Sequence, residues 1–420
     1  MTSEQKAVCE SNADRVRVLA GGGTGKTHTM VNFARLNPDR CLMIAYTNAN
    51  VGVFQQRISS PLVEVCTADS LALGILREHP DFQIPRIDRP QAVDRLAGEC
   101  LAGAFIPNTA GNRKILISAM DYMLARLYSL EGFTSSSSSL PAANLAELVE
   151  TLFSKLAKNR LATFNIWEYL AVYLLESDPV FLARQSKRWA TIIVDEAQDI
   201  TPLLARLIVL LSGSSRLVIV GDPCQEIFCY SGAGIPWFTD PGWEEFHLTT
   251  CFRSAPEILE VVNRTRTDGL TITPANPGVS GTVERWDYQP GKRDWDDFFA
   301  SEISSTLEAG TVAVLADTHA ELDAVAEILE DHEIPYLHNN PNESDATPAS
   351  RRPKEGTVTL STIHSAKGME WDAVHVAGMG SLVHPTVLAG RQERNMQHVA
   401  VSRPRTRLSM YFQEGATRNV

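Results

Sequence analysis

The sequence predicts an α/β protein with parallel sheets whose strands alternate with helices. Short apolar segments and helical segments follow one another in two series, one before residue 246 and one after it. Strands that alternate with helices form parallel sheets covered on both faces. A third observation is a glycine-rich loop between an apolar segment that begins at Val16 and a helix that begins at Lys26. This order of elements is typical of α/β domains that bind phosphate groups.

The stretch from Val16 to Met30 reads VRVLAGGGTGKTHTM. Backbone N–H groups of such a loop surround an anion, and the following helix adds the positive end of its dipole. The Lys side chain reaches the β- and γ-phosphates, and the Thr hydroxyl can ligate Mg²⁺. A glycine-rich turn after a strand is the alternative, and the first motif position is Ala rather than Gly. We predict a nucleoside triphosphate site formed by Ala20, Gly21, Gly22, Gly23, Thr24, Gly25, Lys26 and Thr27.

The composition is that of a globular protein. A hydrophobic fraction of 44% is ordinary, and 420 residues suffice for two or three domains. The apolar run 203–211 is interrupted by Arg206 and is too short to span a bilayer, so we expect no membrane partner. The N-terminus lacks a signal pattern and the seven cysteines form no CxxC pair. We therefore expect a cytoplasmic, reducing setting and no zinc site.

The net charge of −12 argues against a protein that coats nucleic acid through its whole surface. It leaves room for a nucleic-acid motor, because the track of a motor is a local groove.

The strands and helices divide the chain into three parts. Residues 1–73 and 187–245 hold the first series, residues 74–186 are helical, and residues 246–420 hold the second series. We expect Thr201 to cap a helix that starts with Pro202. Polar segments at 134–139 and 338–355 are expected to be loops. The expected strands are 41–46, 191–194, 217–220, 311–315, 357–361, 373–377 and 408–412, and the expected helices include 142–156, 166–175, 321–332 and 394–401.

Two adjacent acids, Asp195 and Glu196, follow a buried strand. In phosphoryl transfer one such carboxylate holds Mg²⁺, and the next orients or deprotonates the attacking water. Taken alone, the pair is also compatible with a helix cap. A further strand ends in GDPCQ, where the amide of Gln225 is placed to sense the γ-phosphate.

Several motifs occur in a fixed order along the chain: VDEAQD at 194–199, GDPCQEIFCYSGA at 221–233, CFRS at 251–254, TIHSAKGMEWD at 362–372 and VAVSRPR at 399–405. In this order the sequence resembles UvrD/Rep-like superfamily 1A DNA helicases from Ser3 to about Phe412. The resemblance implies two RecA-like P-loop NTPase domains with ATP and Mg²⁺ in the cleft between them and single-stranded DNA across their tops. The first domain would comprise residues 1–73 and 187–245, with residues 74–186 as a helical insertion, and the second would comprise residues 246–420.

The resemblance also implies roles for residues around the nucleotide. Gln5 would read the adenine edge, with Phe252 stacked on the adenine and Glu370 on the ribose. Lys26 and Glu196 would act in catalysis, with Thr27 and Asp195 as the metal ligands. The γ-phosphate would be contacted by Gln225 and Arg253 and by an arginine finger, Arg403.

For the DNA track, the resemblance implies an aromatic side chain after a strand of the first domain and a pair of aromatic residues after Gln225. Aromatic rings stack on any base, which suits a motor that ignores sequence. The implied DNA-binding residues are Tyr46, Thr47, Asn48, Phe228, Tyr230 and His364.

The chain departs from the family pattern at five places. His28 replaces an Arg expected against the adenine, and Ala68-Asp69 replaces an aromatic-His pair near the DNA. Ser231 stands where Arg is common, and Pro404 where Ala is usual. Residues 338–355 leave no room for the large inserted subdomain called 2B, which tunes unwinding in the family.

These residues favour a DNA-dependent ATPase that translocates 3′→5′ on single-stranded DNA or unwinds tailed duplexes. The alternative is a DNA-stimulated ATPase that acts as a sensor or regulatory subunit of a nuclease-containing complex, in repair or antiphage defence. RNA as the track is a third reading.

Overall fold

The computed structural model describes residues 1–37, 39–80, 82–86, 90–133, 142–288, 293–308, 310–339, 353–379 and 391–413. The chain divides into two compact units. The first unit contains residues 1–19, 27–221 and 228–247, and the second contains residues 20–26, 222–227 and 248–420. Two short loops of the N-terminal half, 20–26 and 222–227, therefore belong by their contacts to the second unit.

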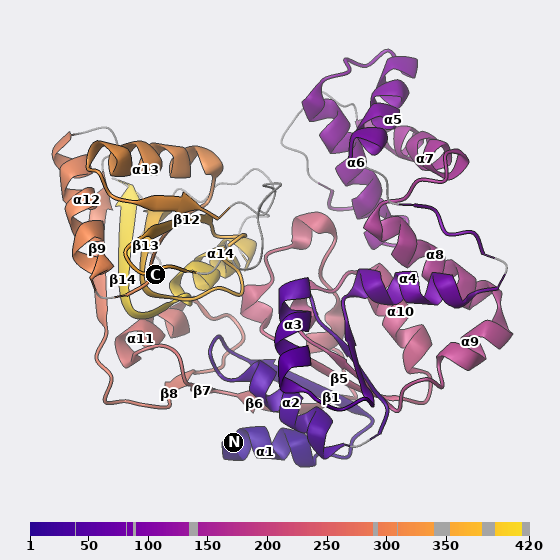
Figure 1. Ribbon diagram of the computed structural model, residues 1–420, viewed down its shortest axis with the longest axis horizontal. Coiled ribbons are helices and arrows are strands. Elements are labelled where there is room, and N and C mark those ends of the chain that lie inside the picture. The colour runs from indigo at the N-terminus through magenta and orange to yellow at the C-terminus, as the bar shows by residue number, and fades with distance from the viewer. Residues whose placement is uncertain are drawn as a thin grey trace. The chain divides into compact units, whose positions relative to one another are not determined.

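The first unit is built on a six-stranded sheet in the order β3-β2-β4-β5-β1-β6; Figure 1 labels its strands β5, β1 and β6. Strand β2 pairs in parallel with β3 and β4, and β5 pairs in parallel with β4 and β1. Every residue of the inner strands β2 and β4 is buried. This burial is typical of a parallel sheet that is covered on both faces, and it accounts for the apolar sequences of the inner strands. Its strands are β1 (Arg15–Ala20), β2 (Cys41–Ile44), β3 (Val63–Cys66), β4 (Thr191–Val194), β5 (Arg216–Gly221) and β6 (Glu244–Leu248).

The helices of the first unit form two apolar cores. One core joins α4 (Ala68–Glu78), α8 (Phe164–Ser177), α9 (Pro179–Gln185) and α10 (Pro202–Ser212) to the sheet. The other joins α5 (Pro90–Gly103), α6 (Ala110–Ala125) and α7 (Ala142–Lys158) to the start of α8. Trp167, Tyr169 and Leu170 of α8 pack against both cores. The remaining helices are α1 (Ser3–Glu10), α2 (Lys26–Leu36) and α3 (Asn48–Arg57).

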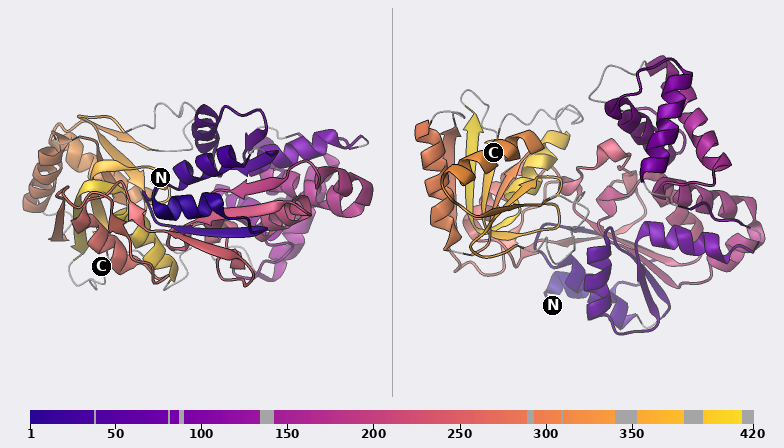
Figure 2. Two further views of the ribbon diagram at one scale, coloured as in Figure 1. Left: turned by 90° about the horizontal axis from the view of Figure 1, so that it is seen from below. Right: turned by 45° about the horizontal axis from the view of Figure 1, so that its top comes forward.

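The second unit is built on a fully parallel sheet in the order β11-β12-β10-β13-β14-β9. Figures 1 and 2 show α12 (Arg293–Leu307) and α13 (His319–Asp331) side by side against this sheet. Helices α11 (Pro256–Thr265) and α14 (Arg391–Val401) pack on each other and on β14 and β13. The strands are β9 (Thr282–Tyr288), β10 (Val312–Ala316), β11 (Tyr336–His338), β12 (Val358–Thr362), β13 (Trp371–Met379) and β14 (Pro404–Gln413), and a short pair is formed by β7 (Thr250–Cys251) and β8 (Thr273–Pro274).

Threonine begins six of the described helices, in each case through a hydroxyl that accepts a hydrogen bond from the N–H three residues later. Such a cap satisfies a helix N–H that has no partner within the helix and contributes about 1 kcal/mol. Thr201 is one of them, which confirms the cap expected before Pro202. The other five are Thr2, Thr47, Thr67, Thr109 and Thr318.

The strands and helices expected from the sequence occur with boundaries shifted by a few residues. The expected loop at 134–139 and most of the one at 338–355 lie outside the described residues. All seven cysteines are free thiols. Among the described helices, none has the length and apolar character needed to cross a membrane.

Candidate functional site

The phosphate loop connects β1 to α2, as the sequence predicts. Gly23 and Gly25 have φ values of 73° and 85°, a left-handed conformation that favours glycine. Thr24 closes the turn by donating from Oγ1 to the Gly21 carbonyl at 2.8 Å. Lys26 and Thr27 are the first two residues of α2, where backbone N–H groups have no partner within the helix. The loop thus presents the geometry on which phosphate binding depends.

The absence of a side chain at Gly22 leaves a space lined by hydrogen-bond donors. A Cβ placed there would lie 3.5 Å from Nη1 of Arg253 and 3.5 Å from Nε2 of Gln225. At Gly23 a Cβ would lie 2.6 Å from Cβ of Arg253, so another residue would not fit. A cradle formed by backbone, an amide NH₂ and a guanidinium group suits a polyphosphate. The second unit therefore brings together Gln225 and Arg253, two of the residues expected at the γ-phosphate.

The acidic pair lies at the end of β4 in the first unit. Asp195 is buried and its N–H donates to the Ile44 carbonyl at 2.9 Å. Glu196 has φ 51° and ψ 47°, a left-handed conformation that is strained for a residue with a side chain. Gln198 Nε2 donates to Glu196 Oε2 at 2.7 Å, which fixes the direction of that carboxylate. The carboxylate of Asp195 and the hydroxyl of Thr27 are hard oxygen donors, the ligand type that Mg²⁺ prefers.

Gln225 and Arg403 contact each other in the second unit. Nη2 of Arg403 donates to Oε1 of Gln225 at 3.0 Å. Both side chains are almost completely buried. The guanidinium group also donates from Nε to the Val399 carbonyl at 2.9 Å and from Nη1 to the Met369 carbonyl at 3.3 Å. Arg403, the expected arginine finger, is therefore hydrogen-bonded to three residues of this protein.

The 3₁₀ turn that carries Gln225, Pro223–Gln225, is held by helix α14. Nδ2 of Asn395 donates to the Pro223 carbonyl at 3.2 Å and to the Glu226 carbonyl at 2.9 Å. The two bonds flank Gln225 on both sides in the sequence. Lys367 donates to the carbonyl of Gln225 itself at 2.6 Å.

Arg253 forms an ion pair between its Nε and Glu370. Glu370 also accepts from Arg405 Nη2 at 2.6 Å. Burial acts to raise the pKa of the Glu370 carboxyl, but Arg253 and Arg405 outweigh burial and hold the pKa below its usual range. The residue expected at the ribose is thus engaged by two arginines. Phe252, expected on the adenine, is 58% exposed, and its N–H donates to the Gly23 carbonyl at 2.9 Å.

The other two residues expected at the adenine lie on α1 and α2. The buried side chain of Gln5 completes a capping box, since its Oε1 accepts from the Thr2 N–H at 3.0 Å. His28 is exposed, and its Nε2 lies 3.1 Å from Nδ2 of Asn32, one helical turn further on.

The first unit brings together the aromatic residues expected along a DNA track. Tyr46 and Phe228 are stacked, with ring centroids 5.5 Å apart and an angle of 18° between the planes. Tyr230 contacts Phe228 edge to face at 6.1 Å. Tyr46 and Tyr230 are 45% and 42% exposed, more than core aromatic residues would be. Thr47 caps α3, which begins at Asn48.

His364, expected at the DNA backbone, lies in the turn after β12 in the second unit.

A group of three carboxyls, one buried and two half-buried, lies among the helices of the first unit, and no sequence motif contains it. Burial, and secondarily the nearby Asp69 and Asp121, raise the pKa of Glu168 on α8 to about 8. Burial raises the pKa of Asp121 on α6 to about 6, against a hydrogen bond from Thr163. Burial also raises the pKa of Asp69, the residue that replaces the family's His.

Two further departures from the family pattern, Ser231 and Pro404, fit the local structure. The hydroxyl of Ser231 donates to the Phe228 carbonyl at 2.8 Å, and Ser231 is exposed. Pro404 is the first residue of β14, a position at which proline is tolerated in a strand.

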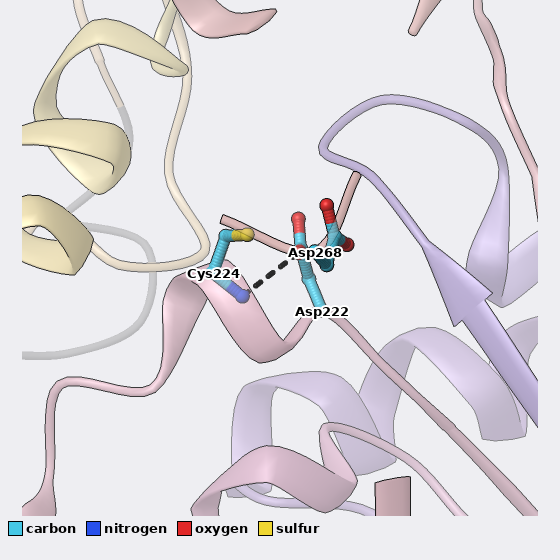
Figure 3. A group of neighbouring side chains, drawn as sticks. All are labelled: Asp222, Cys224 and Asp268. Carbon is cyan, nitrogen blue, oxygen red and sulfur yellow. Dashed lines mark hydrogen bonds between the residues drawn. The ribbon is translucent and has the colours of Figure 1, made fainter. Parts of the chain in front are cut away.

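Sequence reasoning also missed Arg266 and Asp268, because no motif contains them. Figure 3 shows Asp222, Cys224 and Asp268 pointing toward one another, and their ligand atoms lie within 4.8 Å. The guanidinium group of Arg266 donates to both carboxylates, at 3.2 Å from Nη2 to Asp222 Oδ1 and at 3.0 Å from Nε to Asp268 Oδ1. A cation therefore already sits between these acids, and the group is an ion-pair network rather than a metal site.

Parallel sheets and a phosphate loop define the chain as a P-loop NTPase of the α/β class. It matches the UvrD/REP helicase N-terminal domain over residues 1–241 and the UvrD-like helicase C-terminal domain over residues 342–415. The chain therefore belongs to the UvrD/REP helicase family, a superfamily 1 group of ATP-binding DNA helicases. The two sheets with their helices are its two RecA-like domains, and α5–α8 form a helical segment in the first.

Individual relatives are distant. The chain is 26% identical over 285 residues to F-box DNA helicase protein 1 of Schizosaccharomyces pombe, which covers 63% of this chain and 32% of the relative. It is 23% identical to the ATP-dependent DNA helicase PcrA of Staphylococcus epidermidis, over 80% of this chain and 50% of the relative. It is also 23% identical to DNA helicase IV of Escherichia coli, over 94% of this chain and 66% of the relative. The chain spans about one third to two thirds of the length of these three relatives.

Proposed function

We propose that this protein is an ATP-dependent translocase that moves 3′→5′ on single-stranded DNA and unwinds tailed duplexes. The observation that carries the proposal is the convergence of Gln225 Nε2 and Arg253 Nη1 on the space beside Gly22 of the phosphate loop. Two donors, each 3.5 Å from the same point of a phosphate loop, suit the negative charge on a γ-phosphoryl group during transfer. Family membership supports ATP and Mg²⁺ as the ligands.

The proposed roles follow from the chemistry of each side chain. Lys26 binds the β- and γ-phosphates, and Glu196 orients or deprotonates the attacking water. Thr27 and Asp195 hold Mg²⁺, which supplies positive charge at the phosphates when bound. Arg403 and Arg253 add positive charge on the γ-phosphoryl oxygens after they leave Gln225 and Glu370.

The stacked pair Tyr46 and Phe228, with Tyr230 beside it, supports single-stranded DNA as the track. Bases stack on aromatic rings without regard to sequence, at about 1–3 kcal/mol per base. We further propose that Thr47, Asn48 and His364 contact the DNA backbone, that residues 74–186 act as an insertion in the first domain, and that residues 338–355 replace a 2B subdomain with a short loop.

ATP hydrolysis and strand displacement test the proposal directly. We expect hydrolysis that single-stranded DNA stimulates and that Lys26→Ala abolishes, with displacement from duplexes carrying a 3′ tail and none from those with a 5′ tail. Hydrolysis that DNA does not change would contradict the proposal, and equal stimulation by RNA homopolymers would reassign the track.

A second function is favoured by one observation. Arg403 and Arg253 are both engaged by acceptors of the chain itself, Gln225 and Glu370, which suits an ATPase that stays inactive until a partner or DNA releases them. Such a protein would act as a sensor subunit of a nuclease-containing complex in repair or defence. A protein that unwinds tailed duplex alone, as a monomer in sizing experiments, rules out this function.

A further inference from the structure

A buried ion-pair network lies directly beneath the phosphate loop in the second unit. Arg266 follows α11, and its side chain is 1% exposed. Its planar guanidinium group holds two carboxylates at once. Nη1 and Nη2 donate to the two oxygens of Asp222 at 3.3 and 3.2 Å, while Nε and Nη2 donate to the two oxygens of Asp268. A Cβ at Gly21 would lie 3.4 Å from Nη1 of Arg266, so the guanidinium group lies against the loop.

The network continues to the proposed γ-phosphate contact. Nε2 of Gln225 donates to Asp222 Oδ2 at 3.0 Å, and Oε1 of Gln225 accepts from Arg403. An ionised carboxylate only accepts hydrogen bonds and a guanidinium group only donates them. The amide of Gln225 therefore has one orientation that satisfies both neighbours. Because an amide NH₂ has two hydrogens, the same Nε2 can also donate toward the space beside Gly22.

We propose that Arg266, together with Asp268, is a positioning residue for Gln225: it holds Asp222 as an ionised acceptor, which turns the Gln225 NH₂ toward the γ-phosphate. The inference rests on the proposed ATPase function. Arg266 itself touches neither nucleotide nor water in the reaction, and it acts through Asp222.

The charge balance around Asp222 explains why Arg266 is needed. Burial acts to raise the pKa of this carboxyl, but Arg266 and, after it, His398 and Lys26 outweigh burial and hold the pKa well below its usual range. Nε2 of His398 lies 3.7 Å from Oδ2 of Asp222, and the nearby Cys224 is a neutral thiol, since burial raises its pKa. Removing Arg266 takes away the largest of the contributions that oppose burial, so we expect the pKa of Asp222 to rise toward the protonated form.

A protonated Asp222 would act as a hydrogen-bond donor. The Gln225 amide would then flip, because its oxygen can accept from the protonated Asp222. The oxygen would take the position that Nε2 now occupies, near Asp222 and near the space beside Gly22. An amide oxygen beside the γ-phosphate repels it, whereas an N–H attracts it. Loss of Arg266 is therefore expected to affect the γ-phosphate rather than the rest of the nucleotide.

The test compares Arg266→Met with Gln225→Ala and with the control Arg264→Met, an exposed arginine in the last turn of α11, two residues before Arg266. Measurements are kcat and KM for DNA-stimulated ATP hydrolysis, and the affinities for ADP and for a non-hydrolysable ATP analogue. We expect Arg266→Met to lower kcat by about tenfold or more, as misplacement of a reacting group does. Arg266→Met should lower the affinity for the ATP analogue but leave the affinity for ADP unchanged. Arg264→Met should match the wild type in all of these measurements.

Two further variants separate positioning from folding. Arg266→Lys keeps one positive charge and should recover part of kcat. The double variant with Gln225→Ala should be no worse than Gln225→Ala alone, because both changes remove the same contact. Thermal unfolding of each variant shows whether it folds.

The inference is overturned if Arg266→Met retains wild-type kcat while Gln225→Ala is impaired. It is equally overturned if Arg266→Met loses ADP and ATP-analogue affinity in parallel, with no recovery in Arg266→Lys. If Gln225→Ala itself keeps wild-type kcat, the γ-phosphate role of Gln225 and this inference both fail, while DNA-stimulated hydrolysis by the wild type still supports the proposed function.

Discussion

Arg403 donates to the Gln225 amide at 3.0 Å and so joins two segments that are 178 positions apart in the chain. Each side chain is nearly inaccessible to solvent, and each is expected at the same phosphate. The contact occupies the acceptor of Gln225 and one donor of Arg403. A nucleotide that recruits Nη2 of Arg403 must therefore exchange this hydrogen bond for a new one.

Replacing this arginine separates its proposed catalytic role from its structural one. We expect Arg403→Ala to lower kcat by about a thousandfold, the lower range for an arginine finger, with a smaller change in KM. The exposed Arg394→Ala on α14 is the control. A steady-state ATPase assay combined with thermal unfolding makes the measurement, and an unchanged kcat in a folded variant would assign Arg403 to packing.

The phosphate loop should reject a methyl group at Gly23. Gly23→Ala places a Cβ 2.6 Å from Cβ of Arg253, at a φ of 73° that costs an alanine about 1–2 kcal/mol. We expect nucleotide binding to be lost. The matched control is Gly52→Ala in α3, where no atom lies within 4 Å of the new Cβ and stability should rise by about 0.5–1 kcal/mol. Fluorescent-nucleotide titration and chemical denaturation distinguish the two.

The aromatic stack should matter for DNA and not for basal hydrolysis. Tyr46→Ala removes a ring that lies 5.5 Å from Phe228 and is expected to weaken single-stranded DNA binding by about 1–3 kcal/mol. Hydrolysis without DNA should be unchanged. Tyr173→Ala on α8, which removes another exposed ring, is the control. Fluorescence anisotropy with labelled oligonucleotides gives the affinity, and equal binding by both variants would exclude Tyr46 from the track.

Glu168 should make stability fall as pH rises. Its pKa is about 8 in the folded protein against an ordinary value of 4.5, so the folded state binds more protons than the unfolded chain between these values. The free energy of unfolding therefore decreases with rising pH across that window. Glu168→Gln stays neutral and should be more stable than the wild type above pH 8 by on the order of 1–3 kcal/mol, with no difference near pH 4. Denaturation at several pH values tests this, with the exposed Glu147→Gln as control.

The sequence predicted the phosphate loop and most central strands because buried parallel strands are continuous apolar runs, and glycine, lysine and threonine spacing marks the loop. It missed β3 (Val63–Cys66) and β9 (Thr282–Tyr288), and also the short strands β6, β7, β8 and β11. No residue of β3 is fully buried, and β9 is a largely polar strand; both lie at the edge of a sheet, where solvent allows polar side chains. Neither has an apolar run to reveal it.

The side-chain partners at the site could not be predicted in the same way. Arg266 and Asp222 are 44 positions apart, and their ion pair depends on tertiary structure. Glu168 lies in a segment whose helical period was evident, but a glutamate is usually expected on the solvent side of a helix. The structure gives the position and the contacts of the residues that the motifs single out. Their roles in nucleotide and DNA binding remain predictions.

Asn395 binds the Gln225 turn through backbone carbonyls on both flanks, at Pro223 and Glu226. Carbonyl groups are the same whatever side chain the residue carries. The two bonds themselves therefore do not depend on which side chains stand at positions 223 and 226, whereas a change at position 395 removes both bonds at once. Because no side chain of the turn takes part in these bonds, substitutions within the turn cannot restore them once Asn395 is replaced.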